Sequence, residues 1–193
     1  MRWRQLFLMT MQNKVISSST LPPSSSLLQK YLANSEWTLR KRLEYRKGGT
    51  FGTWTGSAHF REDPVRCDTL LYTEDGRLQF DDPTIGGGKA VPSSGRPLAF
   101  VFPEKPVEKP AEVYFVEGSG LRFFHSLPFS TFCGEASAEC LGECSFDHLC
   151  VKDLYSGTFE ICDQDTFTIR WHVYGPTKDG DISQQYTRKR QLQ

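Results

Sequence analysis

The chain has 193 residues, enough for one domain with a sizeable core and a tail. It contains 23 basic and 23 acidic residues, so its net charge gives no support for a nucleic-acid partner. The apolar run at residues 6–9 is far shorter than a membrane span, so no transmembrane segment is predicted.

The N-terminal stretch has its own composition. Residues 1–35 contain basic residues but no acidic residue, a pattern typical of organellar transit peptides. We therefore interpret residues 1–23 as a targeting or disordered segment and residues 24–193 as the folded domain. The targeting interpretation predicts a mitochondrial protein, and without it we expect a cytoplasmic one.

The next stretch predicts one short helix followed by strands. Ser24-Ser25-Ser26 can cap a helix whose leucines share one face. From Trp37 onward, short apolar or alternating runs are separated by turn residues. Strands are expected at residues 37–46, 51–60, 69–73, 77–80, 97–102, 112–116, 121–127, 149–161, 166–174 and 183–188. Glu74-Asp75-Gly76 is expected to form a hairpin turn, and residues 128–147 an insertion.

The clearest strand pattern lies near the C-terminus. Phe167, Ile169, Trp171 and Val173 alternate with polar residues, which indicates a half-buried strand. Gly175-Pro176 should stop this strand, because proline has no N–H for the ladder. Asp179-Gly180 is then expected to turn the chain into the last strand.

Nine or ten short strands with short connections predict an all-β domain. The expected architecture is an antiparallel up-and-down β-barrel of about 8–10 strands, with the short N-terminal helix covering one end. A two-sheet sandwich is the alternative.

Six short motifs are spread over residues 30–190. They are G-x-x-x-G-x-A-x-F from Gly52, Y-x-E-x-G from Tyr72, F-H-x-L from Phe124, H-x-C-x-x-D-x-Y from His148, W-x-V-x-G-P-x-K-D from Trp171 and Y-x-R from Tyr186. This pattern resembles an uncharacterised family of lipocalin-like domains in the calycin group of β-barrels. The first strand departs from it, since Ser35-Glu36-Trp37 stands where lipocalins have G-x-W. The resemblance implies a lipocalin-like barrel with a lumen pocket, but no reaction.

The resemblance also implies site residues. The polar motif residues expected to bind a ligand are His125, His148, Asp153, Tyr155, Tyr186 and Arg188. The last five are expected to converge on one region inside or at one mouth of the barrel, with His125 nearby. The alternative is a buried hydrogen-bond network that holds the barrel closed. Arg188, or alternatively Arg190, is expected to cover Trp37. Arg188 is also expected to pair with Asp153 or Glu74. Structural roles are assigned to Trp37, Glu74, Trp171, Gly175, Pro176, Lys178 and Asp179.

Other chemistries have weaker support. Zinc could be offered Cys133, Cys140, Cys144, His148 and Cys150, but no C-x-x-C pair is present and no metal site is assigned. Reduced cysteines are expected, because no secretory signal is present. No catalytic residue and no cofactor are assigned. A Cys150–His148–Asp153 arrangement and haem ligation by His125 or His172 stay open as alternatives.

We predict a non-enzymatic lipocalin-like barrel that binds a small hydrophobic or amphipathic ligand in its lumen. The alternative is a structural or assembly subunit of a larger protein complex, a mitochondrial one under the targeting interpretation, with protein partners contacting residues 103–110 and 128–147. The lumen discriminates between them, because the 14 Phe and 4 Trp residues could fill it.

Overall fold

The computed structural model describes residues 24–104, 109–129 and 141–190. Within these ranges the chain forms one short α-helix, one 3-10 turn and antiparallel strands. The elements are α1 (Ser24–Leu32), β1 (Ser35–Tyr45), β2 (Thr50–Glu62), β3 (Thr69–Phe80), η1 (Ile85–Gly88), β4 (Val91–Ser94), β5 (Leu98–Val101), β6 (Ala111–Glu117), β7 (Gly120–Leu127), β8 (Gly142–Cys150), β9 (Asp153–Ile161), β10 (Thr166–Tyr174) and β11 (Asp179–Arg188). The predicted all-β antiparallel fold is confirmed, with eleven strands.

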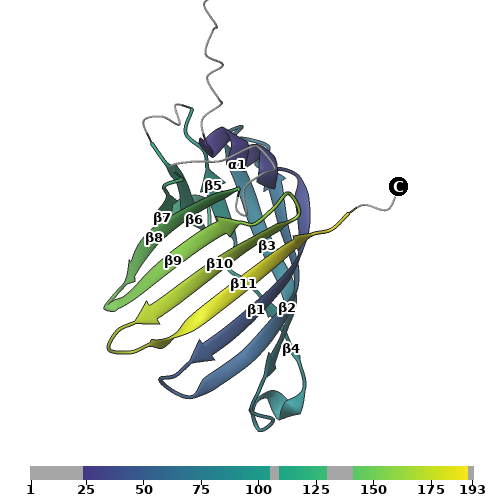
Figure 1. The fold of residues 1–193 in the computed structure, drawn as a ribbon, viewed down its shortest axis with the longest axis vertical. Helices are drawn as coiled ribbons and strands as arrows, with labels where there is room; N and C mark the ends of the chain where they lie inside the picture. The colour runs from purple at the N-terminus through teal and green to yellow at the C-terminus, as the bar shows by residue number, and fades with distance from the viewer. Residues whose placement is uncertain (1–23, 105–108, 130–140, 191–193) are drawn as a thin grey trace, which may run out of the picture.

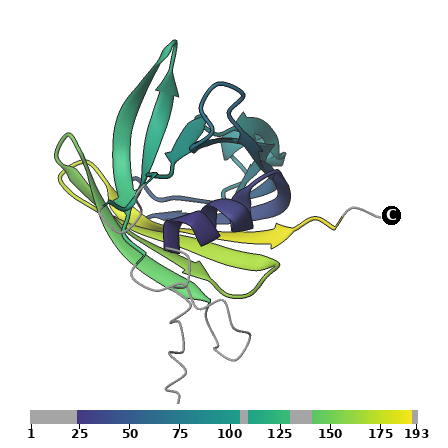
Figure 2. The ribbon, with the colours of Figure 1, turned by 90° about the horizontal axis from the view of Figure 1, so that it is seen from above.

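One sheet curls into a nearly closed barrel (Figure 1). The strand order is β7-β6-β5-β3-β2-β1-β11-β10-β9-β8, and β4 pairs with β3 at one side. The first and last strands are neighbours, with Trp37 opposite Arg188. Helix α1 lies across one end of the barrel, as the view from above shows (Figure 2). The opposite end, where the β1–β2, β8–β9 and β10–β11 turns lie, is called the rim below.

The barrel has a seam between β7 and β8, the two ends of the strand order. His148 bridges it, because its Nδ1 lies 2.8 Å from the Phe124 carbonyl oxygen, to which an Nδ1–H donates. Aromatic contact adds to this bridge, with the Phe124 and His148 rings 4.6 Å apart. Side chains thus close the barrel where backbone pairing ends.

The half of the barrel near α1 is filled by aromatic side chains. Alternate residues face inward on each strand, so Trp37 and Leu39 are both fully buried on β1. Phe167 stacks on Tyr186 with ring centroids 4.1 Å apart, and Trp37 packs edge-on against Phe167 at 4.7 Å. Burying one such large side chain contributes about 1.5–3 kcal/mol. The short helix packs on these rings through Leu28 and Leu32, which are fully buried, and through Tyr31, whose ring lies 5.5 Å from that of Trp37.

The predicted hairpin at Glu74-Asp75-Gly76 is wrong, because β3 runs through it without a turn. Gly76 lies opposite Gly56 on β2, and the Trp54 ring covers this pair. A Cβ on Gly76 would overlap the Thr55 carbonyl oxygen, so the glycine serves close packing in mid-strand. The glycine that suggested a turn is therefore half of a glycine pair covered by the Trp54 ring.

The hairpin before Asp153 was not predicted. Residues 149–161 were expected as one strand, but β8 ends at Cys150 and β9 begins at Asp153. Much of β8 lies in the expected insertion at 128–147, of which residues 130–140 lie outside the described part. Neither Val151 nor Lys152 is typical of a two-residue turn, so composition gave no warning. The last connection is also earlier than expected, since Asp179 and Gly180 already belong to β11.

Candidate functional site

A cavity of about 210 Å³ lies inside the barrel. Its walls are mainly aromatic and aliphatic, with Phe60, Phe100, Phe124, Phe146, Phe159, Ile169, Trp171 and Ile182 among the lining residues. Arg96, just before β5, also lines it and has a side chain that is 55% exposed. The cavity therefore extends from the barrel interior to the rim.

A polar network lies on one wall of the cavity. Lys41 of β1 forms an ion pair with Glu74 of β3, and both side chains are largely buried. The Tyr72 hydroxyl donates to Glu74 Oε2 at 2.5 Å and lies 3.0 Å from the Tyr186 hydroxyl. Tyr186 in turn can donate to Gln184 Oε1 at 2.7 Å. Five side chains from three strands thus form one connected chain of contacts.

The polar wall carries little net charge. Burial raises the pKa of Tyr72 and of Tyr186 well above the usual value for a phenol, so both hydroxyls stay protonated. Across the cavity, burial lowers the pKa of His125 to about 4, so this imidazole is neutral at pH 7. The Lys41 and Glu74 charges offset each other. Such a wall can offer hydrogen bonds to a neutral or amphipathic molecule.

A bulge in β7 builds the opposite wall. Val113 of β6 pairs with His125 and Tyr114 pairs with Phe123, which leaves Phe124 as an extra residue. Phe124 and His125 can therefore both line the cavity although they are adjacent in sequence. The His125 ring stacks on Phe146 with centroids 4.2 Å apart.

The six expected ligand-binding residues do not converge on one region. His125, Tyr155 and Tyr186 line the cavity, whereas His148, Asp153 and Arg188 do not. His148 lies at the seam, Asp153 at the rim and Arg188 at the end near α1. The expected convergence is wrong because β9 begins at the rim and β11 ends at the opposite end.

Asp153 holds the β10–β11 turn in place. Its Oδ1 accepts the Thr177 backbone N–H at 3.0 Å and the Lys178 N–H at 3.3 Å, and its Oδ2 accepts the Thr177 hydroxyl. The Thr177 hydroxyl bond, followed by the backbone bonds, holds the pKa of this carboxyl below its usual range. A Cβ on Gly175 would overlap the same carboxylate, so only glycine fits there. Together these contacts fix the turn that contains Pro176.

Tyr155 connects this turn to the cavity. Lys178 Nζ donates to the Tyr155 hydroxyl at 2.5 Å and lies 5.2 Å from the centre of its ring. Because Tyr155 lines the cavity, the Lys178 ammonium lies beside the end of the cavity that is nearer the rim.

Arg188 packs at the end of the barrel near α1. Its guanidinium lies 4.2 Å from the Trp37 ring and 5.0 Å from the Tyr31 ring. Its Nη2 donates to the Tyr31 carbonyl oxygen at 2.8 Å, which connects β11 to the helix. The expected pairing with Asp153 or Glu74 is wrong, because the neighbouring carboxylate is Asp165 at 3.7 Å.

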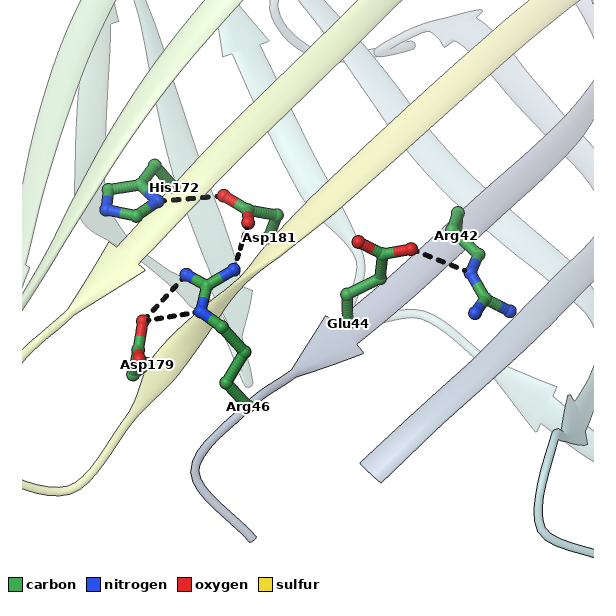
Figure 3. Close-up of polar contacts among 6 residues, drawn as sticks. All are labelled: Arg42, Glu44, Arg46, His172, Asp179 and Asp181. Atoms are coloured by element: carbon green, nitrogen blue, oxygen red, sulfur yellow. Dashed lines mark hydrogen bonds and ion pairs between the residues drawn. The ribbon is translucent and has the colours of Figure 1, made fainter. Parts of the chain in front are cut away.

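A group of charged residues lies on the outer surface near the rim (Figure 3). Arg46 bridges Asp179 at 2.7 Å and Asp181 at 2.5 Å, and His172 Nδ1 lies 2.8 Å from Asp181. These contacts hold the pKa of both aspartates below their usual range, chiefly through Arg46. His172 therefore faces outward and cannot ligate a haem inside the lumen.

The cysteine cluster lies only partly in the described residues. Cys133 and Cys140 fall outside them, and within them no group of three His, Cys, Asp or Glu side chains is placed to hold a metal ion. Cys144 is buried, which raises its pKa to about 12, so the thiol stays protonated. In the described part of the chain, no helix is both long and apolar enough to span a bilayer.

Sequence reasoning missed Lys41, Tyr72 and Gln184 as cavity residues and gave Glu74 and Trp171 structural roles only. A signal for Lys41 was present, because it shares its strand face with Trp37 and Leu39. A lysine in an inward-facing row needs a buried acid nearby, and Glu74 supplies it.

Taken together, the fold and site define a β-barrel with an internal, largely aromatic cavity. The chain belongs to a family of unknown function, DUF6314, whose model matches residues 33–188. No curated protein matches the sequence.

Two solved structures share the fold. The S-type phycobiliprotein lyase CPES from Guillardia theta has a TM-score of 0.57 at 6% identity, covering 86% of this chain and 93% of that one. Rv2717c from M. tuberculosis has a TM-score of 0.53 at 12% identity, covering 86% of this chain and 98% of that one. At such low identity the similarity shows the barrel fold alone.

Proposed function

We propose that this protein is a non-enzymatic, lipocalin-like binding protein that takes a small hydrophobic or amphipathic ligand into its lumen. The cavity of about 210 Å³, with aromatic walls and one connected polar wall, carries this proposal. Small-molecule sites are typically apolar hollows with a few placed polar groups. Pockets for drug-sized ligands are larger, about 300–1,000 Å³, so the ligand here should be compact.

The cavity gives the ligand a defined orientation. Its polar group would face Lys41 and Gln184, since an ammonium has three N–H donors and an amide has two. Its apolar part would pack against Phe124, Phe146 and Trp171, whose rings contact one another in stacked and edge-on arrangements. Entry would be from the side of Arg96.

A fluorescence titration tests this function. The probe is 1-aminoanthracene, a compact neutral fluorophore that brightens in apolar surroundings. The wild type should give a saturable signal with one site, and Leu98→Trp should abolish it by filling the cavity near its mouth. Val65→Trp is the matched control, because Val65 lies on an exposed turn away from the cavity lining. Equal signals from the wild type and Leu98→Trp would contradict lumen binding.

A second candidate function is a structural or assembly subunit. The filled half of the barrel, where Trp37, Phe60 and Phe167 are almost fully buried, favours it. The partner surfaces would include residues 103–110 and 128–147, of which 105–108 and 130–140 lie outside the described residues. A stoichiometric protein partner that survives purification, together with no probe binding in the lumen, would support this alternative.

A further inference from the structure

An exposed apolar patch lies on the outer face of the barrel at the rim. Leu149, Leu154 and Tyr174 stand side by side on β8, β9 and β10, because Leu154 pairs with both of the others. Their exposed fractions are 66%, 42% and 69%, and Val151 at the β8–β9 tip is 88% exposed. Half of the eight exposed large apolar side chains in the described residues therefore gather at one place.

Val151 is also in an unfavourable backbone conformation. Its φ is +60°, in the left-handed region that β-branched residues rarely adopt. This conformation costs roughly 1–2 kcal/mol for an L-residue, and Asn or Gly would be typical at such a turn. An exposed valine recovers little of that cost within the chain. Its presence is therefore better explained by a contact outside the chain.

The patch is surrounded by positive charge. Three neighbouring connections at the rim, residues 46–49, 151–152 and 175–178, contain no acidic residue and four basic ones: Arg46, Lys47, Lys152 and Lys178. Arg46 is engaged by Asp179 and Asp181 (Figure 3), so Lys47, Lys152 and Lys178 supply the positive charge at these tips. Lys47 reaches across to the Pro176 carbonyl, so the basic tips lie close together.

Two connections at the opposite end of the barrel carry an excess of acidic residues. These connections, at residues 63–68 and 162–165, carry Asp63, Asp68, Asp163 and Asp165 against one arginine, Arg66. The connections named at the two ends thus differ in the sign of their charge, although the whole chain has no net charge.

We propose that this part of the rim docks the protein onto an anionic lipid surface. Val151, Leu149, Leu154 and Tyr174 would enter the headgroup region, and Lys47, Lys152 and Lys178 would contact anionic headgroups. Stable surface binding usually needs such a combination of apolar insertion and basic residues. Tyrosine is typical of membrane interfaces, whereas lysine is depleted in protein–protein interfaces. The docking does not depend on what the lumen binds.

The test measures sedimentation of the whole chain with lipid vesicles. Vesicles of phosphatidylcholine with phosphatidylserine should bind the protein, pure phosphatidylcholine vesicles should bind it much less, and added salt should weaken the binding. The double variant Val151→Asn/Leu154→Ser should reduce the affinity for the mixed vesicles about tenfold, and Lys152→Glu should also reduce it.

Two controls lie near the other end of the barrel. Val65→Asn removes a valine that is 87% exposed there, and Lys30→Glu reverses an exposed charge on α1. Both should leave vesicle binding unchanged. Val151→Asn alone should melt at the wild-type temperature or higher, because Asn adopts positive φ more easily. It should also bind the mixed vesicles more weakly than the wild type, and that loss cannot be attributed to unfolding.

Two results would overturn the proposal. The first is that the rim variants bind the mixed vesicles as well as the wild type does. Binding would then be due to another part of the chain, such as the basic residues of segment 1–23, which every variant retains. The second is that the wild type self-associates in analytical ultracentrifugation and the double variant does not, since the patch would then contact a second copy of the chain.

Discussion

Replacing Lys41 by methionine should destabilise the barrel strongly. The change keeps a long side chain in the cavity wall but leaves the Glu74 carboxylate without its ammonium partner. The Lys41 and Glu74 side chains are only 15% and 8% exposed. Removing one member of a buried pair costs about 3–5 kcal/mol, and the partial exposure of Lys41 places the expected loss near 3 kcal/mol.

Urea unfolding followed by tryptophan fluorescence measures this loss. With an m-value of about 2 kcal/mol per M, the midpoint should fall by about 1.5 M. The double variant Lys41→Met/Glu74→Gln should recover most of the stability, because no buried charge then lacks a partner. Arg42→Met is the matched control, since Arg42 is the next residue on the same strand and faces outward to Asp81. Equal losses for Lys41→Met and Arg42→Met would refute the inward placement of Lys41.

Three further predictions concern stability. The pKa of His125 is lowered from 6.5 to about 4, so as pH falls through this window the unfolded chain takes up a proton that the folded chain does not. The free energy of unfolding should therefore drop by about 3 kcal/mol between pH 6.5 and 4. Urea titrations at several pH values should show that this free energy depends less on pH in His125→Phe. The same pH dependence in the variant and the wild type would contradict the burial of this imidazole. Arg188→Lys should lower the free energy of unfolding by about 1–2 kcal/mol, because an ammonium, unlike the planar guanidinium, cannot stack on Trp37. A thermal melt identical to the wild type would argue against this contact. Deleting residues 1–23 should leave the melting temperature nearly unchanged, whereas a loss of many degrees would mean that this segment packs on the barrel and is no simple targeting signal.

Much of the fold could be predicted because every second residue of a half-buried strand is apolar. Trp37 and Leu39 on the first strand and Phe167, Trp171 and Val173 on the tenth show this period, and all five are buried. Turn composition was less informative. Asp75-Gly76 has turn chemistry but lies within a strand.

The candidate site was only partly predictable. His125, Tyr155 and Tyr186 were identified through motifs, and all three line the cavity. Composition does not signal the bulge at Phe124, so the sequence could not predict that Phe124 and His125 both line the cavity. The error over Arg188 was avoidable, because the last strand was already expected to end at this residue. The position of Asp153 depended on the hairpin at residues 151–152, which composition did not signal.

The central claim is that the lumen holds a small molecule. Native mass spectrometry of the protein purified from its own source tests it most directly. Our account predicts a stoichiometric small molecule that stays bound under gentle ionisation and is released when the barrel unfolds. A bare chain mass throughout, or a protein partner with no small molecule, would contradict it.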